Sequence, residues 1–361
     1  MKKRKMIFIA SALFGAMLNS CSLKPLAYQP EPIPSFNGVT QLNEKLLVSK
    51  KIEIDGWFGP EDILFDPLGN LYTGVHNADF SDGRILKIDD SGTVEEFYNS
   101  DAWVAGLHFD KTNNLIALSH KQGLISISPT KEVTVLAATD ENENPFLIPN
   151  GLDIADDGMI YFTNTSQKSA YTIKYGRKVI MEMRPLGGLH SYNPLTKKVN
   201  TLIDGTYFGN GVVVSKDQTY LLMVETTKYR VLKYWLSGNK AGKTEVFINN
   251  LPGFPNGISI RKDGSYWLGF STKRNKALDD IHPKTGMKKF VYELPEFIQP
   301  KAERFGMVMN ISSEGEILKT LFDSQGKILS EAGSVKEYNG YLYIGGDVLP
   351  YIGKYKLETI D

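Results

Sequence analysis

Four oxygen-bearing side chains occupy the same position in a repeated phrase of this sequence and could together hold a cation. They are Glu61, Asn150, Asn210 and Asn256, each just before a short apolar segment, while Gly106 and Gly333 take this position in the other two copies. Ca²⁺ accepts carboxylate and amide oxygens in irregular geometry. Asn-Gly is also a favoured turn pair. Three such pairs in one position, joined by a carboxylate, favour a calcium site over turn chemistry alone.

The five histidines are the other side chains that could bind substrate or exchange a proton near neutral pH. His120 is the substrate-binding candidate because it follows a second strand of the repeat, although we favour a surface position beside Lys121. His282 stands in the polar segment KRNKALDDIHPKTGMKK and is expected to be solvated. Packing or surface positions explain the remaining three, which are His76, His108 and His190.

A sixfold repeat must position these residues. Each copy is an apolar segment, a polar turn and a second segment with an aromatic residue or Leu, and the copies begin at Asp62, Gly106, Gly151, Gly211, Gly257 and Ser334. A third strand follows each copy and a fourth follows five of them, while Lys45–Asp55 can supply the missing strand. We therefore predict an all-β fold, a six-bladed β-propeller with four antiparallel strands per blade and a ring closed by an N-terminal strand.

The innermost strands of a propeller line its central channel. Residues just before these strands converge on one mouth of the channel, where we expect Glu61 and the three asparagines. The stretch between Asn164 and Gly187 interrupts the third blade. We expect it to form a helical or irregular lid over one face.

The N-terminus has the features of an export signal. Met1–Lys5 is basic, and Met6–Leu18 is an apolar run shorter than a bilayer-spanning helix requires. Cys21 follows Leu18-Asn19-Ser20, a setting that resembles the lipobox of bacterial lipoproteins, in which the cysteine is acylated. The alternative is an incidental thiol near an ordinary cleavage site.

Three segments follow from this interpretation. Residues 1–20 are expected to be a lipoprotein signal peptide, 21–40 a lipidated cysteine with an extended proline-rich tether, and 41–361 the propeller. We expect an exported protein of the bacterial cell envelope, bound to a membrane through its lipid anchor. The outer membrane or the periplasmic face is favoured over the cytoplasm.

The composition limits the other partners. Lys and Arg number 41, as do Asp and Glu, so the formal net charge is zero and no nucleic-acid partner is expected. Cys21 is the only cysteine, which excludes an intramolecular disulfide and a cysteine-based zinc site. We expect a monomer with a small-molecule substrate.

Several segments resemble the strictosidine synthase-like branch of six-bladed propellers, which includes adipocyte plasma-membrane-associated proteins and is related to the senescence-marker, gluconolactonase and paraoxonase groups. The resemblance runs from Gly59 to Ile352. Its most specific part is FGNGVVVSKDQTYLLMVETTKYRVLKYWLSGNKAGKTEVFINNLPGFPNGI, and GPEDILFDPLGNLYTG and YNGYLYIGG also match.

The resemblance implies a channel-bound calcium ion in the hydrolytic relatives, with ligands that carry over to Glu61, Asn150 and Asn210. At the fourth ligand the branch usually shows Pro-Asp-Asn, whereas here Pro255-Asn256-Gly257 stands, which removes one charge. The catalytic Glu of true strictosidine synthase falls at Gly333 or Ser334, neither of which can act as a base. The pair Ser119-His120 replaces a common Asp-Ala.

These observations predict a calcium-assisted hydrolase of small esters, lactones or similar substrates. Glu61, Asn150, Asn210 and Asn256 would hold a weakly bound Ca²⁺, and Glu61 and Asn210 would be the catalytic residues. The competing hypothesis is a non-catalytic propeller that binds a ligand or partner at a degenerate metal site. A condensing enzyme of the strictosidine synthase type is the weakest of the three.

Overall fold

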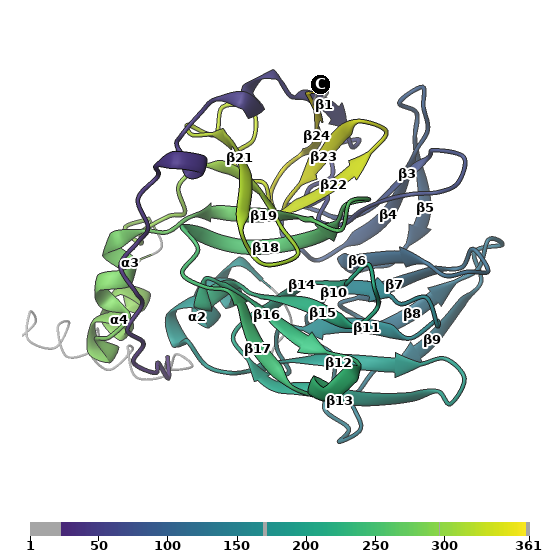
Figure 1. The fold of residues 1–361 in the computed structure, drawn as a ribbon, viewed down its shortest axis with the longest axis horizontal. Coiled ribbons are helices and arrows are strands. Elements are labelled where there is room, and N and C mark those ends of the chain that lie inside the picture. The colour runs from purple at the N-terminus through teal and green to yellow at the C-terminus, as the bar shows by residue number, and fades with distance from the viewer. Residues whose placement is uncertain (1–22, 169–171, 296, 359–361) are drawn as a thin grey trace, which may run out of the picture.

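The computed structural model describes residues 23–168, 172–295 and 297–358, and these form a ring of six four-stranded antiparallel sheets. The first three blades are β2–β5 (Ile63–Phe65, Leu71–His76, Gly83–Ile88, Val94–Asn99), β6–β9 (Val104–Phe109, Leu115–Ser119, Gly123–Ile127, Val133–Ala137) and β10–β13 (Pro149–Ile154, Ile160–Asn164, Gly187–Asn193, Lys198–Thr206). The next two are β14–β17 (Gly209–Val214, Tyr220–Glu225, Arg230–Trp235, Thr244–Ile248) and β18–β21 (Gly253–Ile260, Tyr266–Lys273, Gly306–Ile311, Ile317–Asp323). The predicted six-bladed propeller is confirmed (Figure 1).

The sixth blade joins the two ends of the propeller. It contains β22–β24 (Ser334–Tyr338, Tyr341–Gly345, Tyr351–Lys356) and, as its outer strand, β1 (Lys50–Glu53), with Ile52 opposite Ile352. The predicted closure by an N-terminal strand is therefore confirmed. Only part of the expected segment is a strand, because Lys45–Val48 forms a 3₁₀ helix.

The turns of the repeat are built by aspartates, as expected from their position. Asp66 Oδ1 accepts hydrogen bonds from the backbone amides of Leu68 and Asn70, and Asp110 repeats the pattern one blade later. These carboxylates satisfy turn amides that the β-ladder leaves unpaired. The aspartates thus shape the hairpins and play no part in a channel site.

Three α-helices lie together on one side of the ring: α2 (Ile173–Glu182), α3 (Lys276–Ile281) and α4 (Thr285–Glu293) (Figure 1). α2 lies within the stretch expected to be a lid, and it packs on Ile148 through Tyr175 and Val179. His282, between α3 and α4, is fully buried. The expectation that it is solvated was wrong, because both helices and Tyr28 cover it.

Residues 23–40, expected to form a tether, lie against the propeller instead of extending from it. The backbone amide of Tyr28 donates to the carbonyl of His282, and Phe36 packs on Phe305 and Phe322. The expected signal peptide and Cys21 lie outside the described residues. In the part of the chain that is described, no helix is long and apolar enough to cross a bilayer.

Candidate functional site

The Asn-Gly pairs lie inside innermost strands, not in turns. Asn150-Gly151 belongs to β10, and the other two pairs belong to β14 and β18. A Cβ atom on Gly151 would lie 2.6 Å from the carbonyl oxygen of Asn210, and one on Gly211 would lie 2.8 Å from that of Asn256. Glycine is therefore required because neighbouring innermost strands approach each other closely, and the interpretation as turn chemistry was wrong.

The same close approach between neighbouring innermost strands shows which residue of the second blade is equivalent to the asparagines, and it is not the one predicted. A Cβ atom on Gly106 would lie 2.5 Å from the carbonyl oxygen of Asn150, so Gly106 is equivalent to the glycine of each Asn-Gly pair. Ala105, rather than Gly106, is the residue level with the asparagines. The second blade therefore offers no side-chain oxygen at this level.

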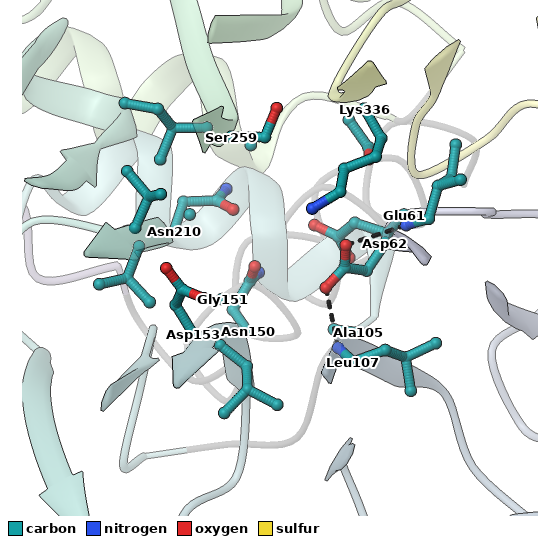
Figure 2. A pocket seen from close by; sticks show the side chains of 18 of the residues that line it. Glu61, Asp62, Ala105, Leu107, Asn150, Gly151, Asp153, Asn210, Ser259 and Lys336 are labelled. Carbon is teal, nitrogen blue, oxygen red and sulfur yellow. Dashed lines mark hydrogen bonds between the residues drawn. The ribbon is translucent and has the colours of Figure 1, made fainter. Parts of the chain in front are cut away.

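The four predicted ligands are brought together at one end of a channel cavity of about 140 Å³. Figure 2 shows Glu61, Asn150 and Asn210 extending toward the same space, and Asn256 also lines it. All four residues are buried. Glu61 Oε2, Asn210 Oδ1 and Asn256 Oδ1 accept no hydrogen bond from any described residue. Buried oxygens without a donor are costly, and these atoms suit a hard cation.

Two further carboxylates lie beside this cluster, those of buried Glu331 and half-buried Asp347, and the sequence analysis missed both. Asp347 Oδ1 lies 3.3 Å from Asn256 Nδ2, and Glu331 Oε1 accepts hydrogen bonds from the backbone amides of Val348 and Leu349. Asp347 follows β23, outside the repeated position, so the repeat gave no signal for it. Asp347 places a negative charge next to Asn256, the position at which the family resemblance predicted an aspartate.

The carboxyl groups influence one another strongly. Burial raises the pKa of Glu61 well above its usual value, and the charges of Asp347, Asp62 and Glu331 add to this effect, while a hydrogen bond with Asn150 opposes it. Burial also raises the pKa values of Asp347 and Glu331. A divalent cation at this position would favour the ionised forms and reverse these shifts.

The side-chain oxygens at this position suit calcium in their chemical type. Within the described residues, no three His, Cys, Asp or Glu side chains form a metal-binding cluster. A cation held here would therefore depend on the amide oxygens of the asparagines as well as on Glu61. Such mixed oxygen donors are typical of Ca²⁺ sites and unlike those of structural zinc.

An aromatic cluster adjoins the site between the first and second blades. The ring of Trp103 contacts His76 and His120 edge to face, and His76 Nε2 lies 2.7 Å from the carbonyl oxygen of Asp347. Burial lowers the pKa of His120 to about 4, and a hydrogen bond with the backbone of Pro149 opposes the shift. The surface position that we favoured for His120 was wrong, because its Nε2 is buried next to the start of β10.

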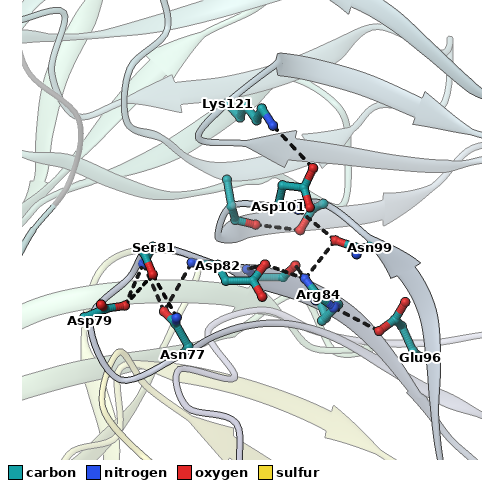
Figure 3. Close-up of polar contacts among 12 residues, drawn as sticks. Asn77, Asp79, Ser81, Asp82, Arg84, Glu96, Asn99, Asp101 and Lys121 are labelled. Carbon is teal, nitrogen blue, oxygen red and sulfur yellow. Dashed lines mark hydrogen bonds and ion pairs between the residues drawn. The ribbon is translucent and has the colours of Figure 1, made fainter.

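The loop between β3 and β4 holds one member of this cluster in place. Phe80 has a φ of 63° and stacks on His76, with 3.8 Å between the ring centroids. Figure 3 shows the polar contacts around it, in which the backbone amide of Ser81 donates to both Asn77 and Asp79. This network fixes the left-handed backbone that turns Phe80 toward the site.

The other end of the cavity is lined by polar residues that join neighbouring blades. Asp62 accepts a hydrogen bond from the backbone amide of Leu107, and Asp153 accepts one from Val214 while His108 Nε2 lies 3.3 Å from its carboxylate. Burial raises the pKa of Asp62 to about 6. These carboxylates connect adjacent innermost strands, so their role is structural.

Comparison with known proteins agrees with the resemblance seen in the sequence. The family model described as strictosidine synthase matches residues 150–239, and the strictosidine synthase-like N-terminal model matches residues 38–88. A strictosidine synthase-like protein of Arabidopsis thaliana is 32% identical over 86% of this chain and 88% of its own length. The chain belongs to the strictosidine synthase-like family. The rat adipocyte plasma membrane-associated protein is 28% identical over 98% of both chains.

Solved structures share the fold of this family member at low identity. A gluconolactonase from Xanthomonas campestris superposes with a TM-score of 0.60 at 15% identity, covering 94% of this chain and 98% of its own. A calcium-binding protein, regucalcin, from Agrobacterium tumefaciens gives 0.59 at 14% identity, covering 86% of this chain and 94% of its own. At such identities the likeness shows the six-bladed fold alone.

The resemblance placed the equivalent of the catalytic glutamate of true strictosidine synthase at Gly333 or Ser334. The structure does bring a carboxylate near this position, because Glu331 precedes β22 by three residues and is buried. Its carboxylate, however, accepts two backbone hydrogen bonds from the loop after Asp347. Glu331 therefore positions that loop, and nothing in its contacts suggests a role as a base toward substrate.

Proposed function

We propose that this chain is a calcium-assisted hydrolase of small esters, lactones or similar substrates, acting as a monomer anchored in the bacterial envelope. The observation that carries the proposal is the set of three buried oxygens without hydrogen-bond donors, on Glu61, Asn210 and Asn256. The gluconolactonase and the calcium-binding regucalcin that share the fold support it by analogy.

When bound, calcium would polarise the carbonyl oxygen of a substrate and lower the pKa of a water molecule. Glu61 would be the principal charged ligand, and Asn150, Asn210 and Asn256 would complete the oxygen set. The amide Nδ2 of Asn210 donates to Thr226 Oγ, which fixes the orientation of the side chain and directs Oδ1 into the cavity. Asn256 Nδ2 donates to Ser271 Oγ and orients its own Oδ1 in the same way.

Asp347 supplies the negative charge that Asn256 lacks. The replacement of the family's aspartate by Asn256 suggested a weak site, with a dissociation constant of ~10⁻⁴ to 10⁻³ M, because calcium affinity follows ligand charge. Asp347, half-buried and in contact with Asn256, restores a second carboxylate to the neighbourhood of Glu61. The site therefore keeps its charge although the position of that charge has changed.

A non-catalytic binding propeller is the second candidate. One observation favours it: the imidazole of His76 is held between two backbone carbonyl oxygens, of Asn77 and Asp347, and so is not available as a general base. His120 is then the remaining histidine near the cluster, and its pKa of about 4 makes it a weak base at pH 7.

Calorimetry on the full chain in detergent tests the proposal directly. Calcium binding that disappears in Glu61→Gln, together with aryl-ester or lactone hydrolysis that requires calcium, would support it. Glu132→Gln is a matched control, because Glu132 is exposed on the outer side of the second blade. Absence of binding at millimolar calcium and hydrolysis indifferent to a chelator would contradict the proposal. Calcium binding without turnover would favour the binding propeller.

A further inference from the structure

Helix α4 is amphipathic in the reverse sense to an ordinary surface helix. Phe290 is 59% exposed and Met287 is 44% exposed, whereas Lys288 is buried. Surface helices normally turn their apolar side chains inward and leave lysine in water. Burial lowers the pKa of Lys288 to about 8. The helix therefore exposes an apolar stripe although it buries a charged residue.

The apolar surface continues beyond the end of the helix. Phe297 is 84% exposed and Ile298 is 55% exposed. Gln299 Nε2 donates to the carbonyl oxygens of Tyr292 and Leu294, so this segment folds back on the end of α4. Four exposed apolar side chains therefore lie on α4 and shortly after its end, and we name them together the α4 face: Met287, Phe290, Phe297 and Ile298.

The N-terminal segment packs against α2 and against the buried side of α4 near its beginning. Leu23 is buried, and the backbone amides of Lys24 and Leu26 both donate to Glu182 at the end of α2. Lys288 Nζ donates to the carbonyl oxygen of Leu26, which joins this segment to α4. Leu26 is itself an apolar residue that is 42% exposed.

The position of Cys21 relative to α4 indicates that the exposed apolar side chains would contact a lipid bilayer. Cys21 is two residues before Leu23, and two extended residues span at most ~7 Å. Acyl chains on Cys21 would therefore enter a membrane next to the α4 face. Exposed lysines stand on the same elements, at position 24 of the N-terminal segment and at positions 284 and 289 of α4 and its N-cap, and suit anionic headgroups.

We propose that the α4 face lies in the headgroup region of the membrane and holds the propeller directly against the bilayer, beside its lipid anchor. The inference rests on the anchoring part of the proposed function and is independent of calcium-assisted hydrolysis. The acyl chains would hold the protein at the membrane, and the α4 face would fix the orientation of the propeller on its surface. Aromatic side chains such as Phe290 and Phe297 are well suited to the interface.

A fluorophore on a unique cysteine tests the proposal with the full chain. Cys21 is the only cysteine, and its sulfur is blocked when it is acylated, so Phe297→Cys introduces one reactive thiol. The labelled chain is bound to vesicles of phosphatidylcholine and phosphatidylglycerol, some of which carry nitroxide-labelled lipid. We expect a blue-shifted emission and at least about twofold quenching by the nitroxide, since the label would lie among the headgroups.

Leu195→Cys is the matched control, because Leu195 is 91% exposed and lies in the turn between β12 and β13, away from the helices. Its label should keep the emission and intensity that it has in water. A chain that floats with the vesicles but shows no difference between the two labels overturns the inference and leaves the anchor intact. A chain that does not float with the vesicles overturns both the membrane contact of the α4 face and the lipid anchor. Neither result affects calcium binding, which calorimetry measures separately.

Discussion

The side-chain amide of Asn256 lies 3.3 Å from the carboxylate of Asp347, although 91 residues separate the two. Asn256 stands in the innermost strand of the fifth blade, and Asp347 follows the second strand of the sixth. The carboxylate that the family resemblance led us to expect at Asn256 is thus replaced by one that reaches the same place from the next blade.

Exchanging the carboxylate and the amide between Asp347 and Asn256 tests whether Asp347 supplies the charge of the calcium site. Asp347→Asn should weaken calcium binding about tenfold, because affinity follows the number of charged ligands. Asn256→Asp should strengthen binding, and the double variant that carries both changes should bind like the original chain. Calorimetry measures the three affinities. Equal affinities in Asp347→Asn and the unchanged protein would show that Asp347 does not contribute to the site.

Glycine is required where innermost strands approach each other. In Gly211→Ala the new Cβ would lie 2.7 Å from the backbone nitrogen of Ile258 and 2.8 Å from the carbonyl oxygen of Asn256. We expect a loss of about 1–3 kcal/mol in the free energy of unfolding. Gly286→Ala is the control, since nothing lies within 4 Å of its Cβ position and alanine favours the helix. Urea denaturation that gave equal stabilities would contradict the explanation.

Buried His282 makes stability depend on pH. Burial and nearby cations lower its pKa from 6.5 to about 3 in the folded protein, so the unfolded chain binds more protons between these values. The contribution of His282 is fully present above pH 6.5 and is lost as pH falls toward 3. Each pH unit in this window costs about 1.4 kcal/mol.

The variant His282→Phe keeps a ring against Tyr28 but cannot titrate. Its unfolding free energy should fall less steeply than that of the original chain between pH 7 and pH 5. The difference should amount to about 2 kcal/mol. Parallel pH profiles would mean that His282 does not remain neutral in the folded state. Urea titrations at several pH values provide the comparison.

A buried arginine, held by an ion pair, joins the N-terminal segment to the propeller. Arg274 pairs with Asp279 at 2.7 Å and also donates to the carbonyl oxygen of Glu31. Arg274→Ala leaves Asp279 buried without its partner, so we expect a loss of about 3–5 kcal/mol and faster proteolysis before residue 40. Lys276→Ala breaks only the exposed pair with Asp280 and should change stability by less than about 1 kcal/mol.

Hydrophobic and turn patterns in the sequence were sufficient to predict the six blades and the closing strand. Those patterns are local: each strand alternates or buries its own side chains, and each aspartate turn is complete within a few residues. The same repeat placed Glu61, Asn150, Asn210 and Asn256 correctly at one level, because equivalent positions of a closed ring meet on its axis.

Only the tertiary structure decided the residues outside the repeat. Asp347 and Glu331 join the site through loops whose course depends on long-range hydrogen bonds, which no local pattern encodes. His120 and His282 looked polar by their neighbours in sequence, yet Trp103 packs on half-buried His120, and Tyr28 from the distant N-terminal segment helps to bury His282. The packing of residues 23–40 on α3 and α4 likewise depends on contacts between segments more than 200 residues apart. Sequence periodicity therefore determined the ring, and the contacts between distant segments determined its electrostatics and its outer surface.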